Sequence, residues 1–223
     1  MAVDLNVLYE DNHIIVVEKE EGILSQGDST GEASMLEMIK DYLKVKYNKP
    51  GNVFVGLVHR LDRRVSGVMV FAKTSKAASR LSEAIRNNLF SKKYVAIVSG
   101  YLTGSDKLVH KLEKKDQLAV ESDNGKESML EYTVINNFKI NKDDFSVLDV
   151  KLITGRYNQI RKQLSLINHP IVNDYKYGYN GKNIEDAFGL RCYELSFPHP
   201  ITKEILTFKS NFRNIWKEKG VVL

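Results

Sequence analysis

The chain has 223 residues, of which 43% are hydrophobic and 27% charged, so it is long enough for one large domain or two small ones with a sizeable core. It has no apolar run of about 18 residues and no N-terminal basic segment followed by an apolar one, so neither a membrane span nor a signal peptide is expected. Cys192 is the only cysteine, which excludes an internal disulfide framework and suits a reducing cytoplasm.

The first half of the chain shows both strand and helix patterns. In chain order, the sequence predicts a buried strand at 13–19, a helix at 34–47, strands at 53–58 and 67–73, a helix at 74–90 and a strand at 92–100. Ser34 and Thr74 are the expected helix caps, and Leu89 is expected on the inner face of the second helix.

The second half contains more strand than helix. Residues 103–127 are polar and are expected to be rich in loops. The remaining predictions are antiparallel strands at 129–138 and 145–153, a short helix at 157–167, a turn at 178–183, a strand at 193–197 and a terminal helix at 210–219. Because strands dominate without regular strand–helix alternation, we expect an α+β fold with a mixed or antiparallel sheet.

The positive charge is concentrated in one segment. The net charge is +5, and residues 60–93 alone hold nine Lys or Arg against two acidic residues. This concentration is typical of either a solvated helix face or a nucleic-acid contact, and the sequence pattern alone leaves both open.

The candidates for catalysis reduce to one carboxylate. The five histidines lack metal-ligand spacing, no glycine-rich phosphate loop is present, and neither Cys192 nor Ser66 lies in a nucleophile motif. Asp62 remains, in "HRLDRRVSG" (59–67) between two predicted strands. Read alone, this stretch favours an ion-paired turn aspartate over a covalent nucleophile or base.

A second stretch, "TGRYNQIRKQLSLINHPIVNDYKYG" (154–178), adds cations that bear on this choice. Arg161 and Gln159 are expected to be displayed in the early turns of the 157–167 helix, near its positive end. Arg156 and Arg161 are five residues apart, so one could reach a carboxylate while the other reaches a phosphate.

The two stretches resemble the signature blocks of the RluA-type RNA pseudouridine synthases. The segments 8–26, "KKYVAIVSG" (92–100) and "YELSFPHPITKE" (193–204) resemble further blocks of that family, in the same order. The resemblance implies a single pseudouridine synthase catalytic domain over 1–223, without a separate N-terminal RNA-binding module. It also implies an α+β fold around a long mixed, mainly antiparallel sheet, with flanking helices and a basic central cleft.

The resemblance also implies roles for individual residues. Asp62 matches the catalytic aspartate, and Arg161 matches the basic residue that pairs with it, at a distance of about 4 Å. Tyr94 matches the tyrosine that stacks on the target base, although the pattern alone favours a core or cross-strand tyrosine. Arg60 matches the arginine that recognises the target nucleotide during flipping. The other residues expected to contact RNA are His59, Lys93, Arg156 and Gln159.

The implied reaction converts uridine in structured ribosomal or transfer RNA to pseudouridine by base flipping and aspartate catalysis. No metal and no cofactor is required. RNA is the expected partner, and the protein is expected to be a cytoplasmic monomer without an obligate protein partner. Two rival functions stay open: a catalytically silent RNA-binding protein on the same scaffold, and a hydrolase that releases free uracil.

Five residues depart from the family pattern, and they leave the RNA target open. Asn158 and Gln163 stand where histidines are common, Asn173 replaces a glycine, and Glu20–Glu21 replace a proline and its neighbour.

Overall fold

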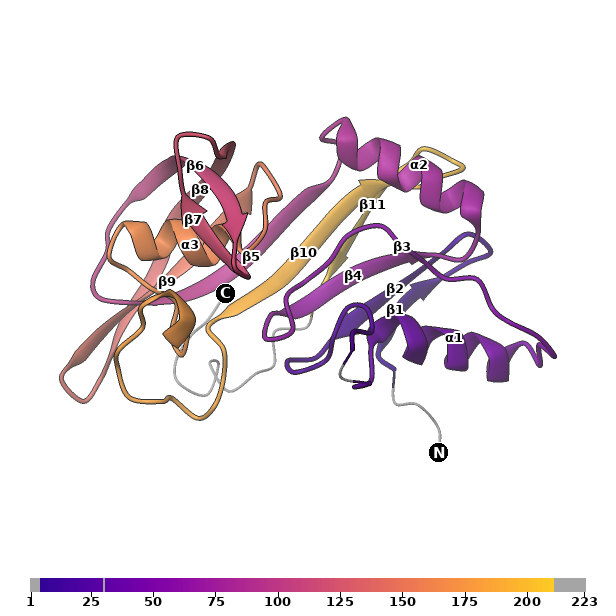
Figure 1. Cartoon of the computed structure of the whole chain (residues 1–223), viewed down its shortest axis with the longest axis horizontal. Helices are drawn as coiled ribbons and strands as arrows, with labels where there is room; N and C mark the ends of the chain where they lie inside the picture. The colour runs from indigo at the N-terminus through magenta and orange to yellow at the C-terminus, as the bar shows by residue number, and fades with distance from the viewer. Residues whose placement is uncertain (1–4, 30, 211–223) are drawn as a thin grey trace. The chain divides into compact units, whose positions relative to one another are not determined.

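A buried pair of strands organises the first part of the chain. A computed structural model describes residues 5–29 and 31–210, and Figure 1 shows its helices and strands. β2 (Ile14–Lys19) pairs antiparallel with β4 (Ser66–Ala72), and every residue of both strands is buried. Their runs of valine and isoleucine predict this, since β-branched side chains pack well on a sheet covered on both faces.

Three shorter strands and one long strand complete this sheet. β1 (Val7–Glu10) pairs with β2, and β3 (Gly56–Leu57) pairs with β4, so the strand predicted at 53–58 is shorter than expected. β10 (Leu190–Pro198) follows β4 in the order β1-β2-β4-β10, and β11 (Ile205–Lys209) pairs with β10.

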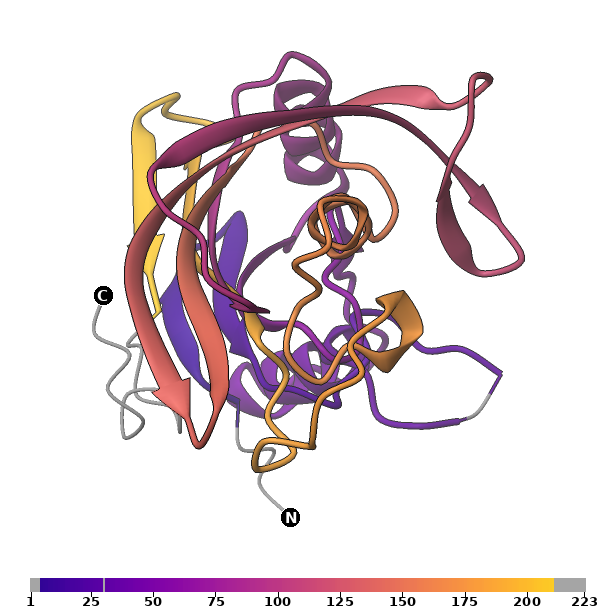
Figure 2. The same ribbon diagram turned by 90° about the vertical axis from the view of Figure 1, so that its left-hand side faces the viewer.

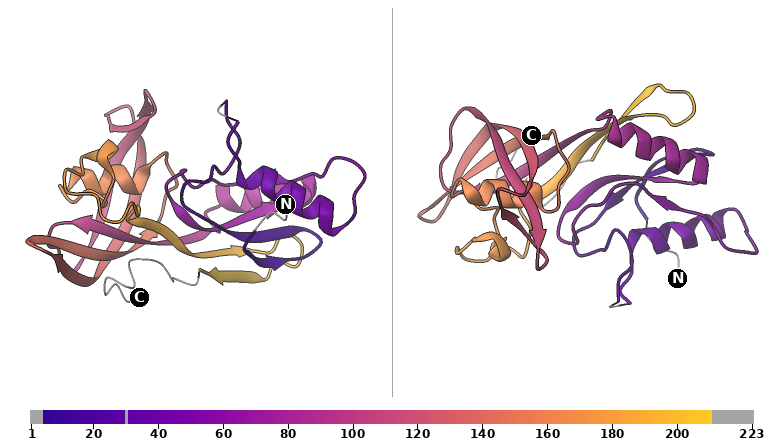
Figure 3. Two further views of the ribbon diagram at one scale, coloured as in Figure 1. Left: turned by 90° about the horizontal axis from the view of Figure 1, so that it is seen from below. Right: turned by 45° about the horizontal axis from the view of Figure 1, so that its top comes forward.

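The two predicted helices of this region form with the predicted caps. α1 (Met35–Lys46) and α2 (Ser75–Arg86) lie alongside these strands in both views of Figure 3. The side-chain oxygens of Ser34 and Thr74 accept the N–H of the third residue of each helix, at 3.4 and 3.1 Å. α2 packs against a buried cluster formed by β2, β4 and β10.

The second helix ends four residues earlier than the pattern predicts. Asn88 adopts a left-handed backbone with φ of 56°, which terminates α2. Leu89 is therefore 55% exposed, and its predicted place on the inner face is wrong.

The second part of the chain is a curved antiparallel sheet around one helix. The strand order is β5-β9-β8-β6-β7. The bounds are β5 (Ser91–Ser99), β6 (Ser105–Lys115), β7 (Leu118–Glu121), β8 (Lys126–Ile140) and β9 (Asp143–Leu152). α3 (Gln159–Leu166) packs against β6 and β7, and Figure 2 shows the strands curving around it. The 3-10 helix η1 (Tyr175–Tyr177) follows.

The prediction of loops at 103–127 is wrong, because this segment contains β6 and β7. Only Leu108, Leu112 and Ala119 are buried there, so few side chains of these two strands contribute to a core. β6 pairs with β8, and β7 pairs with β6 across a tight turn at Asp116 and Gln117, two residues with positive φ.

The described chain divides into two compact units. One comprises the residues up to Ser91 together with Glu194–Ser210, and the other comprises Lys92–Tyr193. The α+β class and the mainly antiparallel pairing are confirmed within them. The single catalytic domain and its central cleft stay predictions, and the helix predicted at 210–219 lies almost wholly outside the described residues. In the described part, no helix is long and apolar enough to cross a membrane.

Candidate active site

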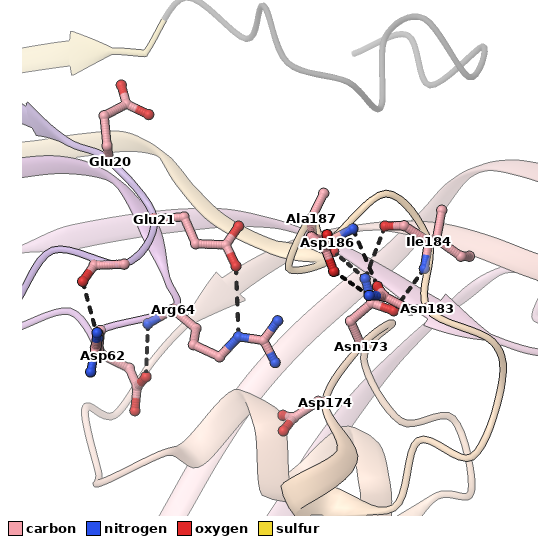
Figure 4. Close-up of polar contacts among 12 residues, drawn as sticks. Glu20, Glu21, Asp62, Arg64, Asn173, Asp174, Asn183, Ile184, Asp186 and Ala187 are labelled. Atoms are coloured by element: carbon pink, nitrogen blue, oxygen red, sulfur yellow. Dashed lines mark hydrogen bonds and ion pairs between the residues drawn. The ribbon is translucent and has the colours of Figure 1, made fainter.

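Asp62 lies in the loop between β3 and β4, and its carboxylate is oriented by the loop itself. Its Oδ1 accepts a hydrogen bond from the N–H of Arg64 at 3.1 Å, as Figure 4 shows. The N–H of Val65 donates to the carbonyl of Asp62 at 3.0 Å, which closes the turn. The side chain is half-buried, so the carboxylate is both held and reachable.

Lys19, at the end of β2, binds the loop that carries Asp62 through its buried ammonium group. Its Nζ donates to the carbonyl oxygens of Glu20 (3.0 Å), Ile23 (2.7 Å) and Arg63 (2.9 Å). These three bonds match the three donors of a lysine ammonium. Lys19 therefore ties the residue after Asp62 to the 20–23 turn.

Ser25 holds the residue before Asp62 in the same way. Its hydroxyl donates to the carbonyl of Leu61 at 2.6 Å and accepts from the N–H of Leu61 at 3.1 Å. The N–H of Gly22 also donates to the carbonyl of Arg63 at 2.9 Å. The segment 19–25 thus fixes the backbone on both sides of Asp62, and we call it the loop clamp.

The charge of Lys19 is unusual because the side chain is fully buried. Burial lowers the pKa of Lys19 from 10.5 to about 8, while the negative charge of Asp62 acts in the opposite direction. At neutral pH Lys19 is therefore mostly cationic. Lys19 was not among the predicted site residues; the signal was a lysine at the end of a strand that begins with four apolar residues.

The arginines beside Asp62 have different surroundings. Arg63 Nη2 lies 2.8 Å from Glu32, and Arg64 Nε lies 3.6 Å from Glu21 (Figure 4). Glu21 is one of the residues that depart from the family pattern, and this contact gives it a partner. Arg60 is exposed, and its contact with RNA stays a prediction.

His59 is buried against the sheet. Its Nε2 accepts the N–H of Val70 at 3.1 Å, and its ring lies edge-on to Phe90 at 6.2 Å. These contacts favour a structural role for His59, so its contact with RNA stays a prediction.

In the other unit, Arg161 forms a buried, two-pronged ion pair with Asp174. Arg161 Nε lies 2.7 Å from Asp174 Oδ2, and Arg161 Nη2 lies 2.7 Å from Oδ1. The rings of Tyr177 and Phe188 lie 4.7 and 5.3 Å from the guanidinium carbon. Arg161 is 5% exposed, so the expectation that it is displayed is wrong. Asp174 was not among the predicted site residues, and pairing of Arg161 with Asp62 stays a prediction.

Gln159 braces the start of α3 instead of being displayed. Its Oε1 accepts from Thr154 Oγ1 (2.9 Å) and from the N–H of Arg156 (3.0 Å). Its Nε2 donates to the carbonyl of Met129 (3.0 Å) and to Gln163 Oε1 (2.9 Å). Because Gln159 is 2% exposed and both amide hydrogens are used, these contacts favour a structural role; its contact with RNA stays a prediction.

The other predicted residues of this unit differ in exposure. Tyr94 lies on β5 opposite Val150 and is 5% exposed. Burial, with a smaller effect of Cys192, raises the pKa of Tyr94 well above its ordinary value. Lys93 is half-buried, and Arg156 is exposed with its Nε donating to the carbonyl of Glu127 at 3.3 Å.

The three departures in this unit each have a structural explanation. Asn158 and Asn173 adopt φ of 47° and 63°, a region that asparagine tolerates better than most residues. Asn173 also donates to the carbonyls of Ile184 and Ala187, at 3.0 and 2.7 Å (Figure 4). Gln163 donates to backbone carbonyls of β6 and β8.

Comparison with known proteins shows the family. A model of the RNA pseudouridylate synthase family matches residues 13–166, a range that contains Asp62, Tyr94 and Arg161. This chain belongs to that family, and the RluA-type resemblance is confirmed.

Individual relatives agree with this assignment. The chain is 30% identical to ribosomal large subunit pseudouridine synthase D of Borreliella burgdorferi, covering 94% of this chain and 69% of the relative. It is also 30% identical to synthase C of Buchnera aphidicola, covering 95% and 68%. The solved structure of human RNA pseudouridylate synthase domain containing 1 has a TM-score of 0.75 at 21% identity, covering 94% of this chain and 84% of that one. The chain thus spans about two thirds of the length of its bacterial relatives.

Proposed function

We propose that this chain isomerises uridine to pseudouridine within RNA, with Asp62 as the catalytic carboxylate. The observation that carries the proposal is the loop clamp: Lys19 and Ser25 hold the backbone at Arg63 and Leu61, on both sides of Asp62. A carboxylate that must act on one ribose position needs such a fixed mount, because small displacements of a reacting group cost large factors in rate.

The reaction needs an ionised carboxylate and a base out of its stack. The bond between the ribose and nitrogen 1 of uracil breaks, the uracil turns, and carbon 5 joins the ribose. Carbon 5 then loses its proton, and nitrogen 1 gains one, so atoms and charge balance. Asp62 serves as nucleophile or as base on the ribose, and in either role the carboxylate group is the reacting group.

We assign the remaining roles as follows. Arg161 pairs with Asp62 and orients its carboxylate; the two bonds to Asp174 support this, because they fix the plane of the guanidinium. Tyr94 stacks on the extruded uracil, and Arg60 contacts the target nucleotide during flipping. Arg156 and Lys93 contact the RNA backbone.

The proposed substrate is structured RNA in the cytoplasm. The bacterial relatives carry names of enzymes for the large ribosomal subunit, which favours ribosomal RNA over transfer RNA as the target. We propose that the enzyme acts as a monomer, without metal or cofactor and without an obligate protein partner.

A product assay tests the function. Ribosomal RNA from cells lacking the gene, labelled with tritium at carbon 5 of uracil, should release tritium on incubation with the enzyme. Pseudouridine should appear in the RNA, and no free uracil should form. Free uracil would instead indicate a hydrolase, and RNA binding without tritium release would indicate a silent binding protein. Mapping pseudouridines in RNA with and without the gene would then identify the site.

A further inference from the structure

An exposed tyrosine stands at the beginning of α3, on the side of the curved sheet where β6 and β7 turn. We propose that Tyr157 is a stacking platform for an unpaired base of the RNA substrate, other than the target uracil, and that the surrounding cations hold the adjacent phosphates. This inference rests on the proposed function, which supplies RNA as the ligand.

The ring of Tyr157 is exposed but held in place. It is 38% exposed, and its hydroxyl donates to the carbonyl of Gln117 at 3.2 Å, in the turn between β6 and β7. A ring fixed by its hydroxyl edge loses little freedom when a base stacks on it. Stacking on such a ring is favourable for any base, since every base has a π-face.

Cations surround this ring on separate elements. Lys114 of β6 has its Nζ 4.8 Å from the ring centroid, and Lys176 of η1 donates to the same carbonyl of Gln117 at 2.7 Å. Arg156, the preceding residue, is exposed. Lys114 therefore lies near the ring and Lys176 near its anchor, and Arg156 adjoins Tyr157 in the chain, so phosphates next to a stacked base would meet positive charge.

An exposed aromatic ring next to cations fits single-stranded RNA better than an acidic peptide or duplex RNA. An acidic peptide would complement Lys114, Lys176 and Arg156 but would not require an exposed aromatic face. Duplex RNA would complement the cations but keeps its bases stacked within the helix, where a ring cannot reach their faces. A single-stranded or looped segment offers both a phosphate and an open base.

The structural alternative is that Tyr157 only braces the β6–β7 turn through its hydroxyl. Two substitutions separate these roles. Tyr157→Phe keeps the aromatic face and removes the hydrogen bond to Gln117, whereas Tyr157→Leu removes both. The matched control is Tyr101→Leu, at a tyrosine of the same unit that is 62% exposed between β5 and β6.

Binding of a short unstructured RNA and of the same sequence annealed to its complement tests the proposal. Tyr157→Leu should weaken single-strand binding by about tenfold or more, while duplex binding stays at the wild-type level. Tyr157→Phe and Tyr101→Leu should bind both forms like wild type. Unchanged binding by Tyr157→Leu, or equal losses in the Phe and Leu variants, would overturn the proposal. Displacement of the RNA by polyglutamate that depends on Tyr157 would overturn it in favour of a protein partner.

Two further measurements separate this inference from the proposed function. Lys114→Gln should reduce the slope of log affinity against log salt by about one for single-stranded RNA, as loss of one phosphate contact requires. If the wild-type protein releases tritium from labelled RNA, and Tyr157→Leu binds RNA and releases tritium as the wild type does, then only the proposed stacking role of Tyr157 is wrong. If wild type releases none, the proposed function itself is wrong.

Discussion

Arg161 binds Asp174 through two hydrogen bonds of 2.7 Å, Nε to Oδ2 and Nη2 to Oδ1, and both side chains are buried. Removing two charges from water is expensive, so such a pair contributes orientation more than stability. Its consequence here is that the guanidinium of Arg161 has one fixed plane before any substrate binds.

Breaking this pair should be costly. Asp174→Asn puts a neutral amide in place of the carboxylate that makes both 2.7 Å contacts with the buried guanidinium of Arg161, so the free energy of unfolding should fall by about 3–5 kcal/mol. Denaturant unfolding measures this change. Lys151→Gln is the matched control, because it removes an exposed pair of 3.4 Å with Glu131 and should cost less than about 1 kcal/mol. Equal losses in the two variants would contradict the structural role of Asp174.

Asn173 combines a left-handed backbone with hydrogen bonds to the 184–187 segment. Asn173→Gly keeps the backbone conformation and loses the bonds, whereas Asn173→Ala also places a Cβ where φ is 63°. The alanine variant should therefore be less stable than the glycine variant by about 1 kcal/mol. Thermal or denaturant unfolding of the two variants checks this order, and the reverse order would argue against backbone strain.

The sequence predicts the parts of the fold that depend on local pattern. The apolar runs of β2 and β4, and the caps Ser34 and Thr74, are short-range features and are confirmed. β6 and β7 were not predicted because most of their side chains face water. β6 forms by pairing with β8, which lies later in the chain, and β7 forms by pairing with β6.

In the candidate site, too, local sequence pattern reveals some residues, and only tertiary contacts reveal the others. Asp62 is recognisable because its block is contiguous in sequence. Lys19 and Asp174 are not, because their significance comes from contacts 44 and 13 residues away along the chain. The burial of Gln159 likewise depends on Met129, which no pattern within its own helix reveals.

The buried ammonium of Lys19 should make stability depend on pH. Its pKa falls from 10.5 in the unfolded chain to about 8 in the folded protein, so between these values the unfolded state binds more protons. Below pH 8 the buried charge lowers the free energy of unfolding, and this loss disappears as the pH rises from 8 to 10.5. The free energy of unfolding of wild type, relative to Lys19→Met, should rise by about 3 kcal/mol over this range.

Chemical unfolding of both proteins at several pH values measures this difference, and the comparison cancels groups common to both. Parallel curves for wild type and Lys19→Met would show that Lys19 keeps an ordinary pKa. A falling difference would show that its carbonyl partners raise the pKa instead.

If the carboxylate of Asp62 performs the chemistry, its removal should abolish tritium release from RNA labelled at carbon 5 of uracil. Asp62→Asn keeps the size of the side chain and removes its charge, and Asp41→Asn, at an exposed aspartate of α1, is the control. We predict that Asp62→Asn binds the RNA with wild-type affinity and releases no tritium, while Asp41→Asn releases it at the wild-type rate. Release by Asp62→Asn at the wild-type rate would contradict the assignment.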